Sequence, residues 1–197
     1  GIDLKALALA GSARSVNLGE LATIRKVEQR LLRHSRESRI SVSGTTGVTP
    51  LSHYVDSGEG CSTGDNDRFL RRSWELNRHE GWLRYCGPGH EHWTYCDTSF
   101  VIRWEDGAGE LARSSQARIQ NTALWNRTGV LVGRVRGITA TLFVGGCFSK
   151  GAVLVCPRDI AHLAPIYTFL ASTEYERAVR SIDPRVSAAT SVLTDVS

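Results

Sequence analysis

The 197-residue chain has 41% hydrophobic and 22% charged residues and a formal net charge of +4. This balance is typical of a soluble globular protein and excludes a disordered chain. No apolar run approaches the roughly 20 residues of a membrane-spanning helix, and the short apolar N-terminal stretch lacks the basic flank of a signal peptide. Because the sequence contains no Met at all, we interpret it as a fragment of a larger protein. Its cysteines, which we expect to be reduced, indicate a cytoplasmic protein.

The first predicted element is a helix over residues 17–38, which with its linker forms an N-terminal segment, residues 1–52. Apolar residues recur there every three or four positions, the spacing of one helix face: Leu18, Leu21, Ile24, Val27, Leu31 and Leu32. The opposite face carries Arg25, Lys26, Arg30 and Arg33. We therefore expect an amphipathic helix, followed by a Gly-, Ser- and Thr-rich loop.

The remaining residues, 53–197, predict an α+β domain that is rich in antiparallel strands and flanked by helices. A short strand is expected near His53–Val55, and "TSFVIRWED" predicts a strand that ends in an acidic turn at residues 105–107. Three β-rich runs follow, "GVLVGRVRG", "ITATLFVGG" and "GAVLVCP", bounded by glycines that favour turns. Asp159 is a candidate N-cap for a final helix over residues 160–182, which ends before Asp183-Pro184.

Positive charge is concentrated in one part of this domain. The interval from Leu111 to Arg158 contains seven Lys/Arg residues and no Asp or Glu. Such a bias is typical of a surface that contacts a phosphate backbone. The alternative is a solvated basic face that acidic residues from elsewhere in the chain neutralise in space.

Motifs for catalysis or metal binding are sparse. "GCSTGDN" is not followed by the Lys-Ser/Thr of a phosphate-binding loop, and no serine-nucleophile elbow or HExxH sequence is present. The five cysteines form no CxxC pair, so a zinc site is disfavoured and reduced, buried cysteines are expected. The cluster most suggestive of metal binding is Cys86, His90, His92 and Cys96.

Two neighbouring segments nevertheless form a specific pattern. "GCSTGDNDRFLRRSWE" and then "GWLRYCGPGHEHWTYCDTSFVIRWEDG" resemble the start of the target-recognition region in large bacterial adenine-N6 DNA methyltransferases. These are the type IIG restriction–modification enzymes and the methylases of the BREX and DISARM phage-defence systems. The positions that match are Gly60, Thr63, Gly64, Asp65, Asn66, Phe69, Trp82, Tyr85, Gly87, Gly89, Trp93, Tyr95, Val101, Trp104, Glu105, Asp106 and Gly107.

The resemblance continues through "WNRTGVLVGRVRGITATLFVGGCFSKGAVLVCP" and "IYTFLASTEYERAVRSIDPRVSAATSVLTDVS", from about Val55 to the C-terminus. Two departures stand out, because the family's lysine is Cys86 here and its N-P-T-x-N-F segment reads "DPRVSA". The family's methyl-donor loop and N-P-P-Y motif are absent from this sequence. The resemblance therefore implies a recognition module that does not methylate unaided.

The partners that the resemblance implies are duplex DNA, the parent protein's catalytic methyltransferase domain and other phage-defence subunits. S-adenosyl-L-methionine would bind in that catalytic domain, and no cofactor or metal is expected in this chain. Because adenine methylation requires the base to be flipped out, the appended module must hold phosphates and read base edges. The predicted DNA-binding residues are Arg113, Arg118, Arg127, Arg134, Arg136, Thr139, Thr141 and Lys150.

The start of "GCSTGDNDRFLRRSWE" is interpreted as a hinge loop toward the catalytic domain. Its residues are Gly60, Thr63, Gly64, Asp65, Asn66 and Arg68. We expect Asp65 and Asn66 to fix this loop through local hydrogen bonds. Trp74, Trp82, Trp93 and Trp104 are expected mostly in the core. Two alternatives stay open: a docking module for another defence subunit, using the basic helix and the aromatic residues, or an enzyme based on His90, His92 and Cys96.

Overall fold

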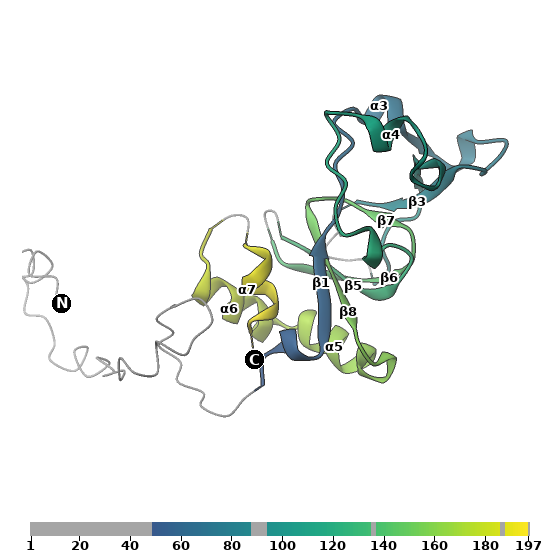
Figure 1. Ribbon diagram of the computed structural model, residues 1–197. Coiled ribbons are helices and arrows are strands. Elements are labelled where there is room, and N and C mark those ends of the chain that lie inside the picture. The colour runs from purple at the N-terminus through teal and green to yellow at the C-terminus, as the bar shows by residue number, and fades with distance from the viewer. Residues whose placement is uncertain (1–48, 88–93, 135–136, 186–187, 197) are drawn as a thin grey trace, which may run out of the picture. The chain divides into compact units, whose positions relative to one another are not determined.

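The computed structural model describes residues 49–87, 94–134, 137–185 and 188–196, all within one compact unit, Val48–Ser197. The predicted N-terminal helix at residues 17–38 lies outside the described residues, and the domain boundary at residues 52–53 stays a prediction. Two β-sheets and several helices make up this unit (Figure 1), so the predicted α+β class is confirmed. None of the helices in the described ranges is long and apolar enough to cross a membrane.

The first sheet contains four antiparallel strands in the order β1-β8-β5-β6. They are β1 (Val55–Glu59), β8 (Ala152–Pro157), β5 (Thr128–Gly133) and β6 (Thr139–Val144). Leu131 of β5 pairs with Thr141 on one side and Leu154 on the other. The three glycine-bounded runs are thus antiparallel neighbours, as predicted.

Strand β8, and β5 after the exposed Thr128, consist of buried apolar residues, because both faces of the sheet are covered. Val130 and Val132 of β5 belong to a core formed with the C-terminal helices, whereas Leu131 between them belongs to the core shared with the second sheet. In β8, Val153 and Leu154 divide in the same way. Alternate side chains of one strand therefore pack against the C-terminal helices on one face and against the second sheet on the other.

Helical segments cover the first of these faces: η6 (Ile160–His162), α5 (Leu163–Leu170), α6 (Thr173–Ile182) and α7 (Thr190–Thr194). Asp159 caps η6 by accepting a hydrogen bond from the Ala161 amide at 3.0 Å, as predicted. The single helix predicted over 160–182 is wrong, because the chain breaks before Thr173. Ser172 has an extended backbone there, and its hydroxyl caps α6 by accepting from the Tyr175 amide at 3.1 Å.

The second sheet has the order β2-β4-β3-β7, with β2 (Leu70–Arg72), β4 (Phe100–Arg103), β3 (Trp82–Cys86) and β7 (Cys147–Phe148). The β3–β7 pair is parallel and the others are antiparallel. Short helical turns accompany these strands: η2 (Leu51–His53), α3 (Asn66–Phe69), η3 (Ser73–Glu75), η4 (Glu105–Gly107), α4 (Glu110–Arg113) and η5 (Thr122–Leu124). Helices α3 and α4 lie together, away from α5, α6 and α7 (Figure 1).

Candidate nucleic-acid interface

The segment Gly60–Arg68, here called the motif loop, is fixed by its own polar side chains. Asp65 caps α3, its carboxylate accepting from the Arg68 amide at 3.1 Å. The Thr63 hydroxyl donates to the Asn66 side-chain oxygen at 2.6 Å. Local bonding of Asp65 and Asn66 is therefore confirmed, although Asn66 bonds a hydroxyl where a backbone amide was expected. A hinge role for the loop stays a prediction.

Glycine permits the close packing of this loop. A Cβ added to Gly60 would lie 2.0 Å from the Phe148 carbonyl oxygen, and Gly64 has a φ of +74°. The Cys61 amide can therefore donate to Phe148 at 2.8 Å. No residue with a side chain could approach the β7 backbone so closely without a local shift.

The backbone of the motif loop runs between two cationic residues of the basic interval. Ser62 exchanges two backbone hydrogen bonds with Arg118, at 3.0 and 2.8 Å. The Lys150 amide donates to the Cys61 carbonyl at 2.8 Å. Residues 118 and 150 are thus brought to opposite sides of the same two loop residues.

Three of the predicted DNA-binding cations form no ion pair with a described residue: Arg113, Arg118 and Lys150. Arg113 ends α4, and α4 is tied to α3 by an ion pair between Arg68 and Glu110. Arg113 and Arg118 are exposed and Lys150 is half-buried. None of the three has an acidic partner among the residues that the structure describes. These three cations, one at the end of α4 and two beside the motif loop, are therefore unpaired within the described ranges, although the motif loop also carries the exposed carboxylate of Asp67.

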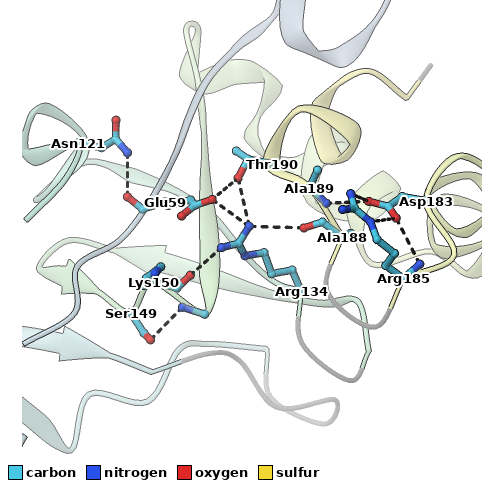
Figure 2. Close-up of polar contacts among 11 residues, drawn as sticks. Glu59, Asn121, Arg134, Ser149, Lys150, Asp183, Arg185, Ala188, Ala189 and Thr190 are labelled. Carbon is cyan, nitrogen blue, oxygen red and sulfur yellow. Dashed lines mark hydrogen bonds and ion pairs between the residues drawn. The ribbon is translucent and has the colours of Figure 1, made fainter. Parts of the chain in front are cut away.

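Arg134 has a different position, inside a polar network between the first sheet and the C-terminal helix (Figure 2). Its guanidinium lies 2.9 Å from the Glu59 carboxylate, with the two side chains only 14% and 24% exposed. The Thr190 hydroxyl donates to the same Glu59 oxygen at 2.8 Å. Arg134 also donates to the Lys150 carbonyl at 3.3 Å. This arginine ties the end of β5 to β1 and α7 and is not free to bind a phosphate.

Arg127 and Arg158 share one acidic partner on β1. They lie 2.9 and 3.2 Å from the two carboxylate oxygens of Asp56. The hydrogen bond from Arg127, with that from Arg158, holds the pKa of Asp56 below its ordinary value. For Arg127, Arg134 and Arg158 the alternative is therefore closer: each is ion-paired with an acidic residue from outside the basic interval, although Asp56 serves two of them. Arg136 lies outside the described residues.

The two threonines predicted to contact DNA lie on one face of β6, but that face points into the protein. Thr141 is fully buried, and its hydroxyl lies 3.4 Å from the Leu131 carbonyl, to which it donates. Its prediction as a DNA contact is wrong. Thr141 is paired with Leu131, and both side chains lie on the face of the first sheet that packs against the second sheet. Thr139, at the start of β6, is half-buried.

The tryptophans expected in the core differ in their exposure to solvent. Trp104 packs at 4.7 Å between ring centroids against the buried Trp125, whereas Trp74 is 70% exposed, so its assignment to the core is wrong. The Arg72 guanidinium lies 3.9 Å from the centre of the Phe100 ring and 5.3 Å from that of Trp74. Trp82 is half-buried and Trp93 lies outside the described residues.

A groove of about 660 Å³ lies beside the Trp82 and Phe100 rings. Its lining residues are Asn66, Asp67, Leu70, Arg71, Arg72, Glu75, Leu76, Trp82 and Phe100. In the sequence, "RRSWEL" places Trp74 among charged residues and outside any apolar period. That polar setting predicts an exposed tryptophan, which the motif-based reading overlooked.

All five cysteines are free and buried, which confirms the expectation of buried thiols. Cys86 and Cys96 contact each other, as do Cys61 and Cys147. Within the described residues no group of three or more His, Cys, Asp or Glu side chains is arranged to hold a metal. His90 and His92 lie outside those residues.

Comparison with known proteins gives no further assignment. No protein-family model matches the chain, and no curated protein matches it either. The resemblance to the target-recognition regions of adenine-N6 methyltransferases therefore depends on the ordered motifs of the sequence alone.

Proposed function

We propose that residues 53–197 are the DNA-sequence recognition module of an adenine-N6 DNA methyltransferase, from a restriction–modification or phage-defence system. The module positions duplex DNA so that a catalytic domain, which binds S-adenosyl-L-methionine, can flip and methylate the target adenine. Such a protein would work in the bacterial cytoplasm, where its DNA lies. The ordered motifs of the sequence support this assignment to a family.

The observation that carries the proposal is the position of Arg118 and Lys150 on either side of the motif loop. Their side chains have no acidic partner among the described residues, so their charge can be neutralised by phosphates. Each phosphate contact releases condensed counterions, which makes binding salt-dependent. An exposed arginine can also make a bidentate pair with a guanine edge, worth about 1–3 kcal/mol of discrimination. Arg118 and Arg113 are the candidates for that role.

A titration of the 197-residue chain with fluorescent duplex DNA, followed by anisotropy at several salt concentrations, tests the proposal. We expect the logarithm of the affinity to fall linearly with the logarithm of salt concentration, and Arg118→Ala to make the slope shallower by about 0.9. Arg177→Ala is the matched control, because Arg177 is an exposed α6 arginine already paired with Glu174. Absence of binding at low salt, also when the parent's catalytic domain is present, would overturn the proposal.

A second function, docking of another protein, is favoured by the exposed Trp74, whose ring contacts Arg72 of the groove. Exposed Trp and Arg side chains are the residues that most often dominate protein interfaces. The partner would be the parent's catalytic domain or another defence subunit. Calorimetry of the chain with that catalytic domain distinguishes the two functions: binding that Trp74→Ala weakens and high salt does not, in a chain without DNA affinity, favours docking.

A further inference from the structure

Four of the five cysteines lie in two pairs of contacting thiols. The sulfur atoms of Cys86 and Cys96 are 2.8 Å apart, and those of Cys61 and Cys147 are 2.9 Å apart. A disulfide bond measures about 2.0 Å between its sulfurs, so each pair could close with a small movement of side chains. Cys156, also buried, has no sulfur partner among the described residues and provides an internal reference.

The two pairs are separate sites and do not form one tetrathiolate metal centre. In the parallel pairing of β3 and β7, Tyr85 aligns with Cys147 and Cys86 aligns with Phe148. Successive residues of a strand point to opposite faces of the sheet. Cys147 and Cys86 therefore project from opposite faces, each toward its own partner.

We propose that Cys86 and Cys96 form a thiol–disulfide exchange site, which reacts with small disulfides such as oxidised glutathione and closes a Cys86–Cys96 disulfide. This inference is independent of the proposed function, since it needs only the contact between the two thiols. The Cys61–Cys147 pair would react more slowly, because its thiols are more deeply buried.

Access and charge both select Cys96 as the attacking residue. Cys96 is 6% exposed and follows Tyr95, which is 63% exposed, whereas Cys61, Cys86 and Cys147 are 1% exposed or less. The hydrogen bond from Cys86 holds the pKa of Cys96 below its ordinary value, and the same bond together with burial raises the pKa of Cys86. Burial raises the pKa of Cys147. The thiolate, which is the nucleophile in exchange, is thus favoured at Cys96.

The exchange proceeds in two balanced steps. The Cys96 thiolate attacks oxidised glutathione, forms a mixed disulfide with one glutathione sulfur and releases the other as a thiolate. Cys86 then loses its proton to solvent and attacks the Cys96 sulfur, which releases the second glutathione thiolate. The two protein thiols are oxidised to one disulfide, and one glutathione disulfide is reduced to two thiol molecules.

Closure would join the two sheets covalently. Cys86 ends β3 in the second sheet, whereas the Cys96 amide donates to Leu142 of β6, in the first sheet, at 3.0 Å. The bond would thus link one edge of the first sheet to the middle of the second. An oxidised chain should resist unfolding better than a reduced one, since a cross-link restricts the unfolded state.

The test exposes the reduced, folded chain to oxidised glutathione for increasing times, quenches with acid, alkylates the remaining thiols and maps peptides by mass spectrometry. We expect the Cys86–Cys96 cross-linked peptide to appear first and Cys156 to remain alkylated. Failure of that peptide to form, or formation of the Cys61–Cys147 peptide at an equal or higher rate, would overturn the proposal. The urea-unfolded chain is the control, and it should also give the Cys147–Cys156 pair, which is close in sequence.

Two variants test the order of the steps. In Cys86→Ser the glutathione adduct should accumulate on Cys96, because the resolving thiol is absent. In Cys96→Ser, Cys86 should stay unmodified over the same period. An adduct on Cys86 in the second variant would contradict the assignment of Cys96 as the nucleophile. If either variant does not fold, the relative rates in the wild-type chain still decide whether the site exists.

Discussion

Cationic residues of the same basic interval lie beside β1, at one edge of the first sheet, and beside the motif loop, but their charges meet different surroundings. At β1, Arg127, Arg134 and Arg158 are each ion-paired, the first and last with Asp56 and Arg134 with Glu59. Beside the motif loop, Arg118 and Lys150 have no acidic partner in the described part of the chain. A local excess of positive charge in a sequence therefore predicts a cationic surface only where the fold brings no carboxylate to it.

The same comparison separates structural from exposed polar residues. Arg134 and Glu59 are largely buried and share hydrogen bonds with Thr190, so they hold layers together. Arg113 and Arg118 are exposed and bind nothing acidic that the structure describes. Substitutions at β1 should consequently change stability, and substitutions beside the motif loop should change binding.

The largest expected effect is that of Glu59→Gln. It leaves the Arg134 guanidinium, which is 14% exposed, without a counter-charge. Removal of one partner from a fully buried ion pair costs about 3–5 kcal/mol, so at this partly exposed site we expect a loss of about 2–3 kcal/mol. The free energy of unfolding in urea should fall by that order. Asp56→Asn is the matched control, since its pairs with Arg127 and Arg158 are half-exposed, and it should cost about 1 kcal/mol or less. Equal losses in both variants would contradict the distinction between buried and exposed pairs.

An intermediate effect is expected for Gly64→Ala in the motif loop. The φ of +74° strains any residue with a Cβ, and this Cβ would meet the Gln116 carbonyl oxygen at 2.6 Å. We expect a loss of about 1–2 kcal/mol, together with weaker DNA binding if the loop supports the interface. Thermal unfolding and the anisotropy titration measure the two consequences. A variant as stable as wild type would show that the loop tolerates rearrangement.

The acid sensitivity of the C-terminal region should depend on Asp183. Its buried carboxylate accepts two hydrogen bonds from the Arg185 guanidinium, both at 2.7 Å, and one from the Ala189 amide at 3.0 Å. The bonds from Arg185, with those from the backbone, hold the pKa of Asp183 well below its ordinary value. A depressed pKa adds stability above the unfolded-state value of about 4, and this contribution is lost as the pH falls.

Unfolding midpoints measured from pH 7 down to the acid limit test that dependence. Asp183→Asn should be less stable than wild type at neutral pH, and the difference should shrink as the pH falls below about 4. A constant difference across the pH range would show that the charge of Asp183 does not contribute.

The smallest change in stability is expected for Trp74→Ala. Because the indole is 70% exposed, its removal should change the free energy of unfolding by only about 0.5 kcal/mol or less. Trp125→Ala, which empties a buried position, is the contrasting variant and should cost about 3–5 kcal/mol. A large loss at Trp74 would mean that the ring contributes to the core.

Much of the first sheet was predictable, because β5, β6 and β8 are long apolar runs bounded by glycines. The second sheet was largely missed. Its strands β2 and β7 have three and two residues, too few for a period to show, and β7 pairs with β3 across some sixty residues of sequence. The break before Thr173 was missed because the apolar spacing continues through Ser172, whose capping role depends on its backbone conformation.

The cationic character of the candidate site was predictable from the sequence, but which residues form it was less so. The basic interval predicted where cations occur, but not which of them are paired. Asp56 lies on β1, 71 residues before Arg127 and 102 before Arg158, and pairing over that distance leaves no local signal. The burial of Thr141 depends on which face of β6 meets the second sheet. The alternation of side chains along a strand places Thr139 and Thr141 on the same face, but it does not indicate whether that face is buried or exposed.

The most direct test of the central claim compares two charge-matched double variants for duplex DNA binding across salt concentrations. Arg118→Ala with Lys150→Ala removes the unpaired cations, and Arg127→Ala with Arg158→Ala removes two that already share Asp56. We expect the first pair to make the slope of log affinity against log salt shallower by about 1.8, corresponding to two phosphate contacts, and the second to leave it near the wild-type value. Equal slopes in the two variants, or a larger change from Arg127 and Arg158, would contradict the account.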